Sequence, residues 1–120
     1  MLVGIDVIDV VRMQKFLQNE RFLNKYFTPY EAMYVSNTVR KTQSLAGIYA
    51  AKEAFLKALG IGIGKGIELN EIEIHHKDNG KPYIILSKNA MIRTATYKVT
   101  DIQISISHTD DVCTAICILN

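Results

Sequence analysis

Hydrophobic residues follow strand and helix periodicities in separate stretches of the chain. Leu2 to Ile8 is apolar and β-branched enough for an opening strand, and Asp9 can cap a first helix that runs to about Gln18. Thr28-Pro29-Tyr30-Glu31 combines a capping box with a proline at the first helical position. We therefore expect a second, short helix from Thr28 to about Ser36.

The longest helix is predicted from about Thr42 to Leu59, because apolar residues recur there at helical spacing and Gly60 supplies a C-terminal stop. Beyond a glycine-rich stretch, the Asn-Gly pair within Asp78 to Lys81 is a strong hairpin-turn signal. It predicts an antiparallel pair made of the segments Ile72 to His76 and Pro82 to Leu86.

The last third of the chain continues this alternation of elements. Ser87 can cap a helix over Lys88 to Ala95, and Ile102 to Ser107 alternates apolar and polar residues as in a half-buried strand. Val112 to Leu119 predicts a final strand. We expect an α+β fold with one compact domain over residues 1–120, in which helices pack on one face of a mostly antiparallel sheet.

Composition limits the function classes. With 48% hydrophobic residues in 120, the chain can bury a core without disulfides or a structural metal, and a net charge of +2 supports anionic ligands without demanding nucleic acid. Asp6 precedes any apolar run long enough for a signal sequence, and no later run is long enough to cross a membrane. We expect a soluble, cytoplasmic protein.

The two cysteines, Cys113 and Cys117, lie in the last predicted strand. Four residues of strand span about 13 Å, which is beyond disulfide reach. We expect buried thiols. The alternative, a Cys-x3-Cys metal pair, lacks any further cysteine or a histidine in the same segment.

Two carboxylates stand out as candidate ligands. Asp6 sits in an otherwise apolar strand, where its charge needs a cation or good donors, so a structural salt bridge and a metal site are both open. Glu53 lies among small residues and shares a helical face with Tyr49, Lys57 and Gly60, although an ordinary Glu53–Lys57 surface pair is the simpler alternative. Two carboxylates from separate elements suit Mg²⁺, which completes its octahedron with waters and substrate phosphates.

The run Gly60 to Gly66 is not a P-loop. It is one residue short, Gly66 stands where Ser or Thr is required, and it follows a helix instead of opening one. It is either a helix stop with a tight connection or backbone lying beneath a nucleotide. His108, at the end of a strand, can simply cap the turn that follows, and His75 and His76 point to opposite faces of their strand as surface or sheet residues.

Four ordered segments together resemble the holo-acyl-carrier-protein synthases, the small single-domain members of the phosphopantetheinyl transferase superfamily. Their order and intervals match across nearly the whole chain. The segments are Gly4-Ile5-Asp6-Val7, the stretch from Ala46 to Gly64 that contains Ala50-Ala51-Lys52-Glu53-Ala54-Phe55, Asn79-Gly80-Lys81-Pro82, and Ser105-Ile106-Ser107-His108-Thr109.

The resemblance implies the phosphopantetheinyl transferase fold, assembled as a homotrimer with sites between protomers. It implies transfer of the 4'-phosphopantetheine arm of coenzyme A to a serine of apo-acyl carrier protein, leaving 3',5'-ADP, in support of fatty acid biosynthesis. Asp6 and Glu53 match the magnesium ligands, and with Lys57 they match the catalytic positions. Two further groups of residues are implied to bind partners: Lys57, Gly60, Gly62, Gly64 and His108 for coenzyme A, and Arg12, Arg21 and Phe22 for the carrier protein.

The chain departs from the family pattern at Ile48-Tyr49, where the family usually has Arg-Phe, and at Leu2, where many members have glycine. The first departure removes a positive charge near the site. Two other hypotheses therefore stay open: a noncatalytic coenzyme A or nucleotide-binding module, and a small RNA-binding domain. The second fits less well, because the candidate strands carry mainly aliphatic residues where RNA-binding sheets expose aromatic and basic ones.

Overall fold

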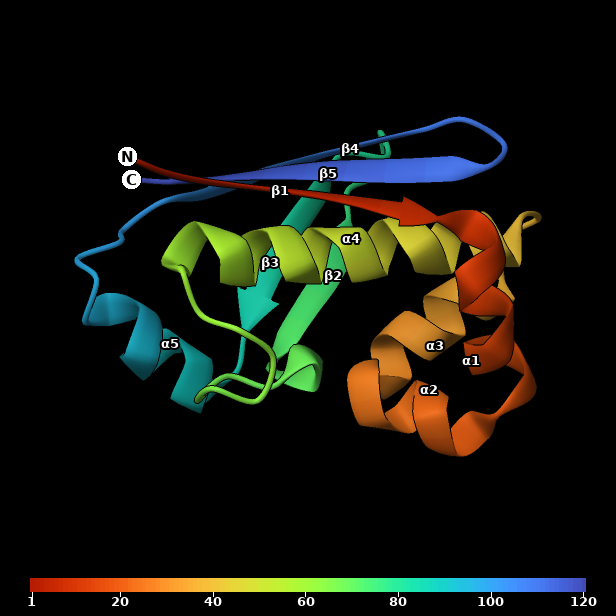
Figure 1. The fold of residues 1–120 in the computed structure, drawn as a ribbon, viewed down its shortest axis with the longest axis horizontal. Coiled ribbons are helices and arrows are strands. Elements are labelled where there is room, and N and C mark those ends of the chain that lie inside the picture. The colour runs from red at the N-terminus through yellow and green to blue at the C-terminus, as the bar shows by residue number, and fades with distance from the viewer.

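A long helix packed against a three-stranded antiparallel sheet organises the computed structural model, which describes all residues 1–120 (Figure 1). Strand β5 (Val112–Leu119) lies between β1 (Leu2–Asp9) and β4 (Ile102–His108), and helix α4 (Lys41–Leu59) runs along one face of the sheet. A separate hairpin pairs β2 (Ile72–His76) with β3 (Pro82–Leu86). The predicted α+β fold is confirmed, with the antiparallel strands divided between two sheets.

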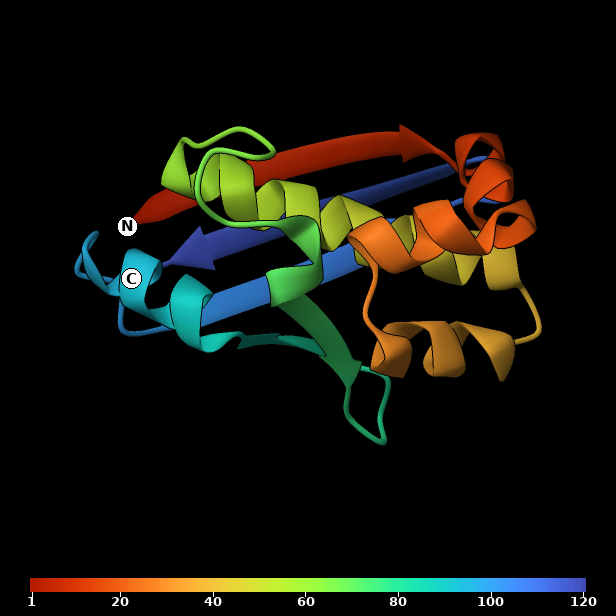
Figure 2. The ribbon, with the colours of Figure 1, turned by 90° about the horizontal axis from the view of Figure 1, so that it is seen from below.

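Short helices flank both ends of α4 (Figure 2). Three of them and a 3-10 turn connect β1 to α4, and α5 (Lys88–Ala95) follows the hairpin. The connecting elements are η1 (Val10–Met13), α1 (Gln14–Gln18), α2 (Glu20–Tyr26) and α3 (Pro29–Ser36), and a second 3-10 turn, η2 (Leu69–Glu71), precedes β2.

Local capping explains where most of these helices start. The predicted capping box is present: the Thr28 hydroxyl accepts from the Glu31 amide at 3.2 Å, and the Glu31 carboxylate accepts from the Thr28 amide at 2.9 Å. Ser87 likewise caps α5. The predicted cap at Asp9 is wrong, because its side chain makes no capping bond and the first turn is a 3-10 helix. The sequence interpretation also missed α2, which Asn19 caps through its side chain.

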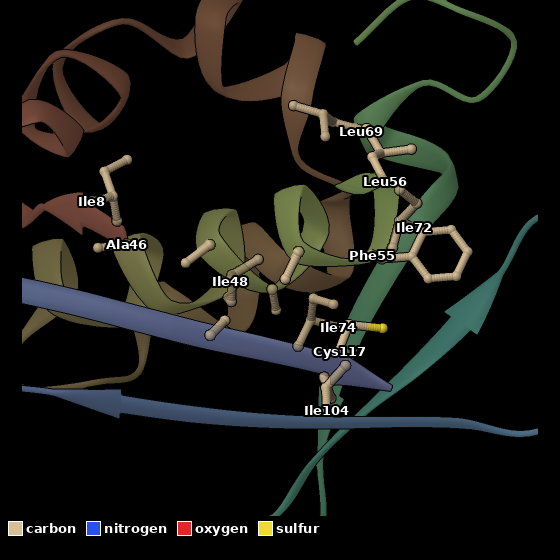
Figure 3. Close-up of a cluster of buried hydrophobic side chains, with 14 of the residues drawn as sticks. Ile8, Ala46, Ile48, Phe55, Leu56, Leu69, Ile72, Ile74, Ile104 and Cys117 are labelled. Atoms are coloured by element: carbon tan, nitrogen blue, oxygen red, sulfur yellow. The ribbon is translucent and has the colours of Figure 1, made fainter. Parts of the chain in front are cut away.

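The hydrophobic core lies between α4, the three-stranded sheet and the hairpin (Figure 3). Alternate residues of β1 and β5 point at α4, so Ile8, Cys113 and Cys117 are buried. Ile72 and Ile74 of β2 close the opposite side of α4. The expectation of buried free thiols is confirmed, and neither cysteine belongs to a cluster of metal-binding side chains.

One ion pair crosses this core. Lys52 of α4 and Glu31 of α3 are both fully buried, with Nζ and Oε1 2.6 Å apart. Lys52 also donates to the carbonyl oxygens of Tyr26 and Leu69, and Glu31 accepts from the Ile74 amide. This network satisfies both charges and ties α2, α3, η2 and β2 to the central helix.

The face of the three-stranded sheet that points away from α4 has no helix over it (Figure 1). Val3, Ile5, Val7 and Ile116 lie there with 52%, 58%, 63% and 36% of their surface exposed. We call this group the outer sheet face. In addition, none of the helices has the length and apolar character needed to cross a membrane.

Candidate active site

Three of the predicted site residues meet where β1 passes α4. Asp6 points toward the helix because it alternates with the buried residues Gly4 and Ile8, and Lys57 Nζ donates to Asp6 Oδ1 at 2.9 Å. The Asp6 side chain is 13% exposed, whereas that of Lys57 is 54% exposed. The cation that compensates Asp6 is therefore a half-exposed ammonium group, which a ligand can approach.

Glu53 lies one helical turn before Lys57 on the same side of α4. The structure shows no ion pair between them, so the expected alternative of a Glu53–Lys57 surface pair is wrong: Lys57 binds Asp6 across the two elements. Burial raises the pKa of Glu53, and the negative charge of Asp6 raises it further, while the Tyr49 hydroxyl and Lys57 lower it. Glu53 and Asp6 are therefore close enough for the charge of Asp6 to affect the ionisation of Glu53.

Tyr49 of α4 lies between Glu53 and the aromatic residues of the short helices. Its ring lies against Phe16 and Phe27, with centroids 6.1 and 6.3 Å away, and its hydroxyl interacts with Glu53. Burial, together with the negative charge of Glu53, raises the pKa of Tyr49 to about 12. Tyr49 is therefore an uncharged phenol close to Glu53.

The donor set fits a hard divalent cation that shares its coordination with a ligand. Two carboxylates from different elements come together, and no third Asp, Glu, His or Cys side chain joins them to complete a closed metal cage. The raised pKa of Glu53 reflects repulsion from Asp6 as well as burial, and a cation between the two would relieve that repulsion. Mg²⁺ is usually held in this way, by one or two carboxylates plus waters and phosphate oxygens.

The glycine-rich connection leaves α4 directly beyond Lys57. Gly60 adopts the left-handed conformation, with φ 74°, and caps the helix, as the sequence predicted. Gly62 and Gly64 follow as exposed backbone, and a Cβ atom at Gly64 would meet nothing within 4 Å. The backbone here is open to a ligand that reaches Lys57.

His108 is not part of this cluster. Strands β1 and β4 are opposite edges of the three-stranded sheet, with β5 between them and α4 over one face. Asp6 pairs with Lys57 of α4 at the β1 edge, whereas His108 ends β4 at the other edge. It lines a pocket of about 400 Å³, together with Tyr34, Arg40, Ile48 and His76 among others. We call this the β4 pocket. The predicted coenzyme A residues thus fall into two groups, on opposite flanks of one helix.

The predicted carrier-binding residues lie in two of the short elements that follow β1, η1 and α2. Arg12 in η1 and Arg21 in α2 are exposed and form no ion pair, and Phe22 is 45% exposed although its ring edge contacts Phe16. Arg12 is also near enough to lower the pKa of Tyr49, against its net rise. A basic surface with one exposed aromatic ring therefore adjoins the carboxylate cluster.

Other residues of interest were missed or placed differently by sequence reasoning. Arg40 lines the β4 pocket and forms an ion pair with Asp110 at 2.7 Å. The two residues are far apart in the sequence, so no local motif predicts this pair. His75 and His76 are sheet residues of β2, as expected, and their rings stack on Tyr30 and Tyr34 at centroid distances of 3.8 and 4.3 Å, which sequence reasoning did not foresee. They do lie on opposite faces of β2, as expected, because they are adjacent in a strand.

Comparison with known proteins agrees with this arrangement. The family model described as "4'-phosphopantetheinyl transferase superfamily" matches residues 2–117. The holo-[acyl-carrier-protein] synthase of Cytophaga hutchinsonii is 40% identical over 121 residues, which cover 98% of this chain and 95% of that protein. A relative of the same name from Halothermothrix orenii is 42% identical over 108 residues, covering 88% and 86% of the two chains.

Solved structures of the same family superpose on nearly the whole chain. The holo-[acyl-carrier-protein] synthase of Helicobacter pylori in complex with coenzyme A has a TM-score of 0.86 at 30% identity, covering 99% of this chain and 100% of that one. The Neisseria meningitidis structure has a TM-score of 0.90 at 25% identity, covering 100% and 99%. The chain therefore belongs to the 4'-phosphopantetheinyl transferase superfamily, among its holo-[acyl-carrier-protein] synthases.

Proposed function

We propose that this chain transfers the 4'-phosphopantetheine arm of coenzyme A to a serine of apo-acyl carrier protein with the help of a magnesium ion held by Asp6 and Glu53. The observation that carries the proposal is the convergence of these two carboxylates and Lys57 where β1 crosses α4. The relatives are named for this reaction, and two of the solved relatives were determined with coenzyme A or its 3',5'-ADP part.

In the reaction, the serine hydroxyl oxygen attacks the β-phosphorus of coenzyme A. A new oxygen–phosphorus bond forms and the serine proton is released to solvent, the bond between the β-phosphorus and the bridging oxygen of the pyrophosphate breaks, and 3',5'-ADP leaves with that oxygen. When bound, Mg²⁺ supplies positive charge to the phosphate oxygens. Lys57 would exchange its contact with Asp6 for one with the pyrophosphate, which its half-exposed ammonium group permits.

The division of the coenzyme A residues between two flanks of α4 supports the expected assembly. His108 lies at the opposite edge of the sheet from the carboxylate cluster of its own chain, and in the proposal one coenzyme A contacts residues of two copies. The outer sheet face provides a surface for such contacts, because contiguous exposed aliphatic side chains mark an interaction site. We therefore include a homotrimer with sites between protomers in the proposal.

The carrier protein would bind beside the carboxylate cluster, on the surface that carries Arg12, Arg21 and Phe22. The two guanidinium groups are exposed and unpaired, so they are available to acidic side chains of a partner. Phe22 adds an exposed aromatic side chain next to Arg21. The proposal places the reaction in the cytoplasm, as part of fatty acid biosynthesis.

A mass measurement tests the reaction directly. Apo-acyl carrier protein, coenzyme A and Mg²⁺ should give a carrier heavier by one phosphopantetheine group only when this protein is present. Asp6→Asn and Glu53→Gln should each lower turnover by about 10²-fold or more while the far-ultraviolet circular dichroism stays unchanged. No mass shift with several different carriers would refute the transfer, and full activity in both variants would refute the shared metal site.

A further inference from the structure

The glycine-rich connection after α4 is exposed along its middle and is held at its first end by the helix. The amides of Gly60 and Ile61 donate to carbonyl oxygens in the last turn of α4 at 3.0 Å. Residues 62–65 are exposed, and the Lys65 amide donates to the Gly62 carbonyl at 3.2 Å, which closes a turn. We call residues 61–65 the glycine loop. Because the loop buries little of its own surface, its position depends on how its two ends are held.

Gly66 follows the glycine loop in a conformation that side chains rarely allow. Its φ is 118°, and the next residue, Ile67, is fully buried in the core. The burial of Ile67 fixes where the chain re-enters the core, but a glycine backbone can still rotate through many conformations. The Gly66 carbonyl oxygen accepts a hydrogen bond from Asn89 Nδ2 of α5 at 3.1 Å, where the connection passes α5 (Figure 1). This bond therefore sets the orientation of the peptide group at the end of the loop.

Asn89 is itself held in place by a carboxylate. Its Nδ2 also donates to both carboxylate oxygens of Glu71 in η2, at 3.0 and 3.2 Å. The same carboxylate accepts from the Ser87 hydroxyl and from the Glu68 amide, each at 2.9 Å. Glu71 thus joins η2 to the start of α5, and the Asn89 amide is oriented before it reaches Gly66.

Arg93 lies against Gly66 from the same helix. A Cβ atom built on Gly66 would stand 2.9 Å from Nη1 and 3.1 Å from Cζ of the Arg93 side chain. Asn89 and Arg93 are four residues apart in α5, so they share one face of that helix. Two side chains of one helical face therefore contact the residue at which the glycine loop ends.

The proposed function gives this contact a role, because it lays Gly60, Gly62 and Gly64 against coenzyme A. A loop that is already ordered binds a ligand without a further loss of backbone entropy. Resting on that function, we infer that Asn89 is a positioning residue, which orders the glycine loop for coenzyme A through its hydrogen bond to Gly66. Arg93 supports the same end of the loop. Asn89 acts through the loop and not on the reacting atoms.

Asn37 provides a matched control far from the loop. Its Nδ2 donates to the Met33 carbonyl oxygen at 3.1 Å, at the end of α3. Asn37→Ala and Asn89→Ala therefore each remove an exposed bond of the same length from a side-chain amide to a backbone carbonyl. Asn89→Gln keeps the amide donor on a longer side chain and should restore part of whatever Asn89→Ala loses.

Limited digestion with trypsin measures the order of the loop without any ligand. Trypsin cleaves after lysine, and Lys65 is an exposed lysine within the glycine loop. Mass spectrometry at early times should show cleavage after Lys65 about threefold faster or more in Asn89→Ala, since proteolysis follows the population of open loop. Asn37→Ala should be cleaved there at the rate of the unaltered protein, and Asn89→Gln at an intermediate rate.

Calorimetric titration with coenzyme A in the presence of Mg²⁺ measures the consequence for binding. Asn89→Ala should bind coenzyme A about three- to fivefold more weakly, the size of one hydrogen bond between uncharged groups. In the carrier mass-shift assay, its KM for coenzyme A should rise by the same factor with kcat unchanged. A general loss of folded protein would lower the apparent kcat instead, and Asn37→Ala should change neither constant.

Two outcomes overturn the inference: equal cleavage after Lys65 in Asn89→Ala and Asn37→Ala, or faster cleavage in Asn89→Ala with unchanged affinity for coenzyme A. The unaltered protein separates the inference from the proposed function. If it binds coenzyme A and shows the Asn89 effects but gives no carrier mass shift, the transfer alone is rejected. A mass shift without any effect of Asn89→Ala rejects the role of Asn89 alone, and no binding of coenzyme A rejects both.

Discussion

Gly4 of β1 lies so close to Ala54 of α4 that a Cβ atom on Gly4 would stand 2.0 Å from the Ala54 carbonyl oxygen and 2.5 Å from the Ala58 amide nitrogen. No side chain of any size fits between this strand and this helix. Since Asp6 follows two residues later on the same face, the close approach also sets the distance between Asp6 and Lys57.

Gly4→Ala should therefore destabilise the fold, because the contact is with backbone, which cannot rotate away. We expect a loss of about 1–3 kcal/mol or more in urea unfolding. Gly62→Ala is the control: a Cβ atom there would meet only the flexible Lys65 side chain, at 3.7 Å, and the change should stay within about 0.5 kcal/mol. Equal stability of the two variants would contradict the close packing of β1 on α4.

The interaction between Tyr49 and Glu53 predicts a pH effect. The pKa of Glu53 is raised by burial, and a carboxylate that holds a metal must be ionised, so activity should fall as the pH drops through that raised pKa. The Tyr49 hydroxyl lowers the pKa of Glu53. Tyr49→Phe should therefore move the acidic limb of kcat/KM to higher pH.

The control for this measurement is Tyr97→Phe, which removes a hydroxyl from an exposed ring after α5. Its pH profile should coincide with that of the unaltered protein. The same substrates are used for all three proteins, so ionisation of the substrates affects the three profiles equally. An acidic limb that stays in place in Tyr49→Phe, or moves to lower pH, would show that Glu53 does not govern it.

The buried Lys52–Glu31 pair predicts a non-additive pair of substitutions. Lys52→Met leaves the Glu31 carboxylate buried without a cation, and we expect a loss of about 3–5 kcal/mol in unfolding free energy. Adding Glu31→Gln removes that isolated charge while keeping an oxygen for one of its two amide donors, Thr28 or Ile74, so the double variant should be more stable than Lys52→Met alone. Lys88→Met, at an exposed lysine, should be neutral.

A double variant as unstable as Lys52→Met would mean that the lost bonds from Lys52 to the Tyr26 and Leu69 carbonyls account for the whole effect. Urea unfolding monitored by circular dichroism separates these outcomes for all four proteins.

The outer sheet face predicts the oligomeric state. Ile5 on this face and Ile92 on α5 are matched in exposure, at 58% and 59%. Light scattering should give the unaltered protein three times the mass of the 13.5 kDa chain. Ile5→Glu should shift it toward the monomer and reduce transfer, since the proposed site is shared between two copies, whereas Ile92→Glu should remain trimeric. A monomeric unaltered protein with full activity would refute the shared site.

Local sequence signals determined most of the secondary structure, because caps, turns and hydrophobic spacing act within a few residues. The box at Thr28, the stop at Gly60 and the hairpin at Asn79-Gly80 are all present. The failures were local too: a 3-10 turn replaced the predicted Asp9 cap, and the cap of α2 at Asn19 went unnoticed. Short polar residues are too common for every one of them to be read as a cap.

The sequence by itself also singled out Asp6 and Glu53 as candidate site residues, since an aspartate inside an apolar strand and a glutamate on a small-residue helix face are unusual wherever they occur. Only the tertiary structure decided their partners. Lys57 binds Asp6 and not Glu53, although Glu53 is the neighbour along the helix, because the packing of β1 against α4 brings Asp6 within 2.9 Å. The position of His108 is also a tertiary feature. The strand order β1-β5-β4 places β4, which carries His108, and β1, which carries Asp6, at opposite edges of the sheet. Such distances depend on contacts between residues far apart in the chain, which no local pattern encodes.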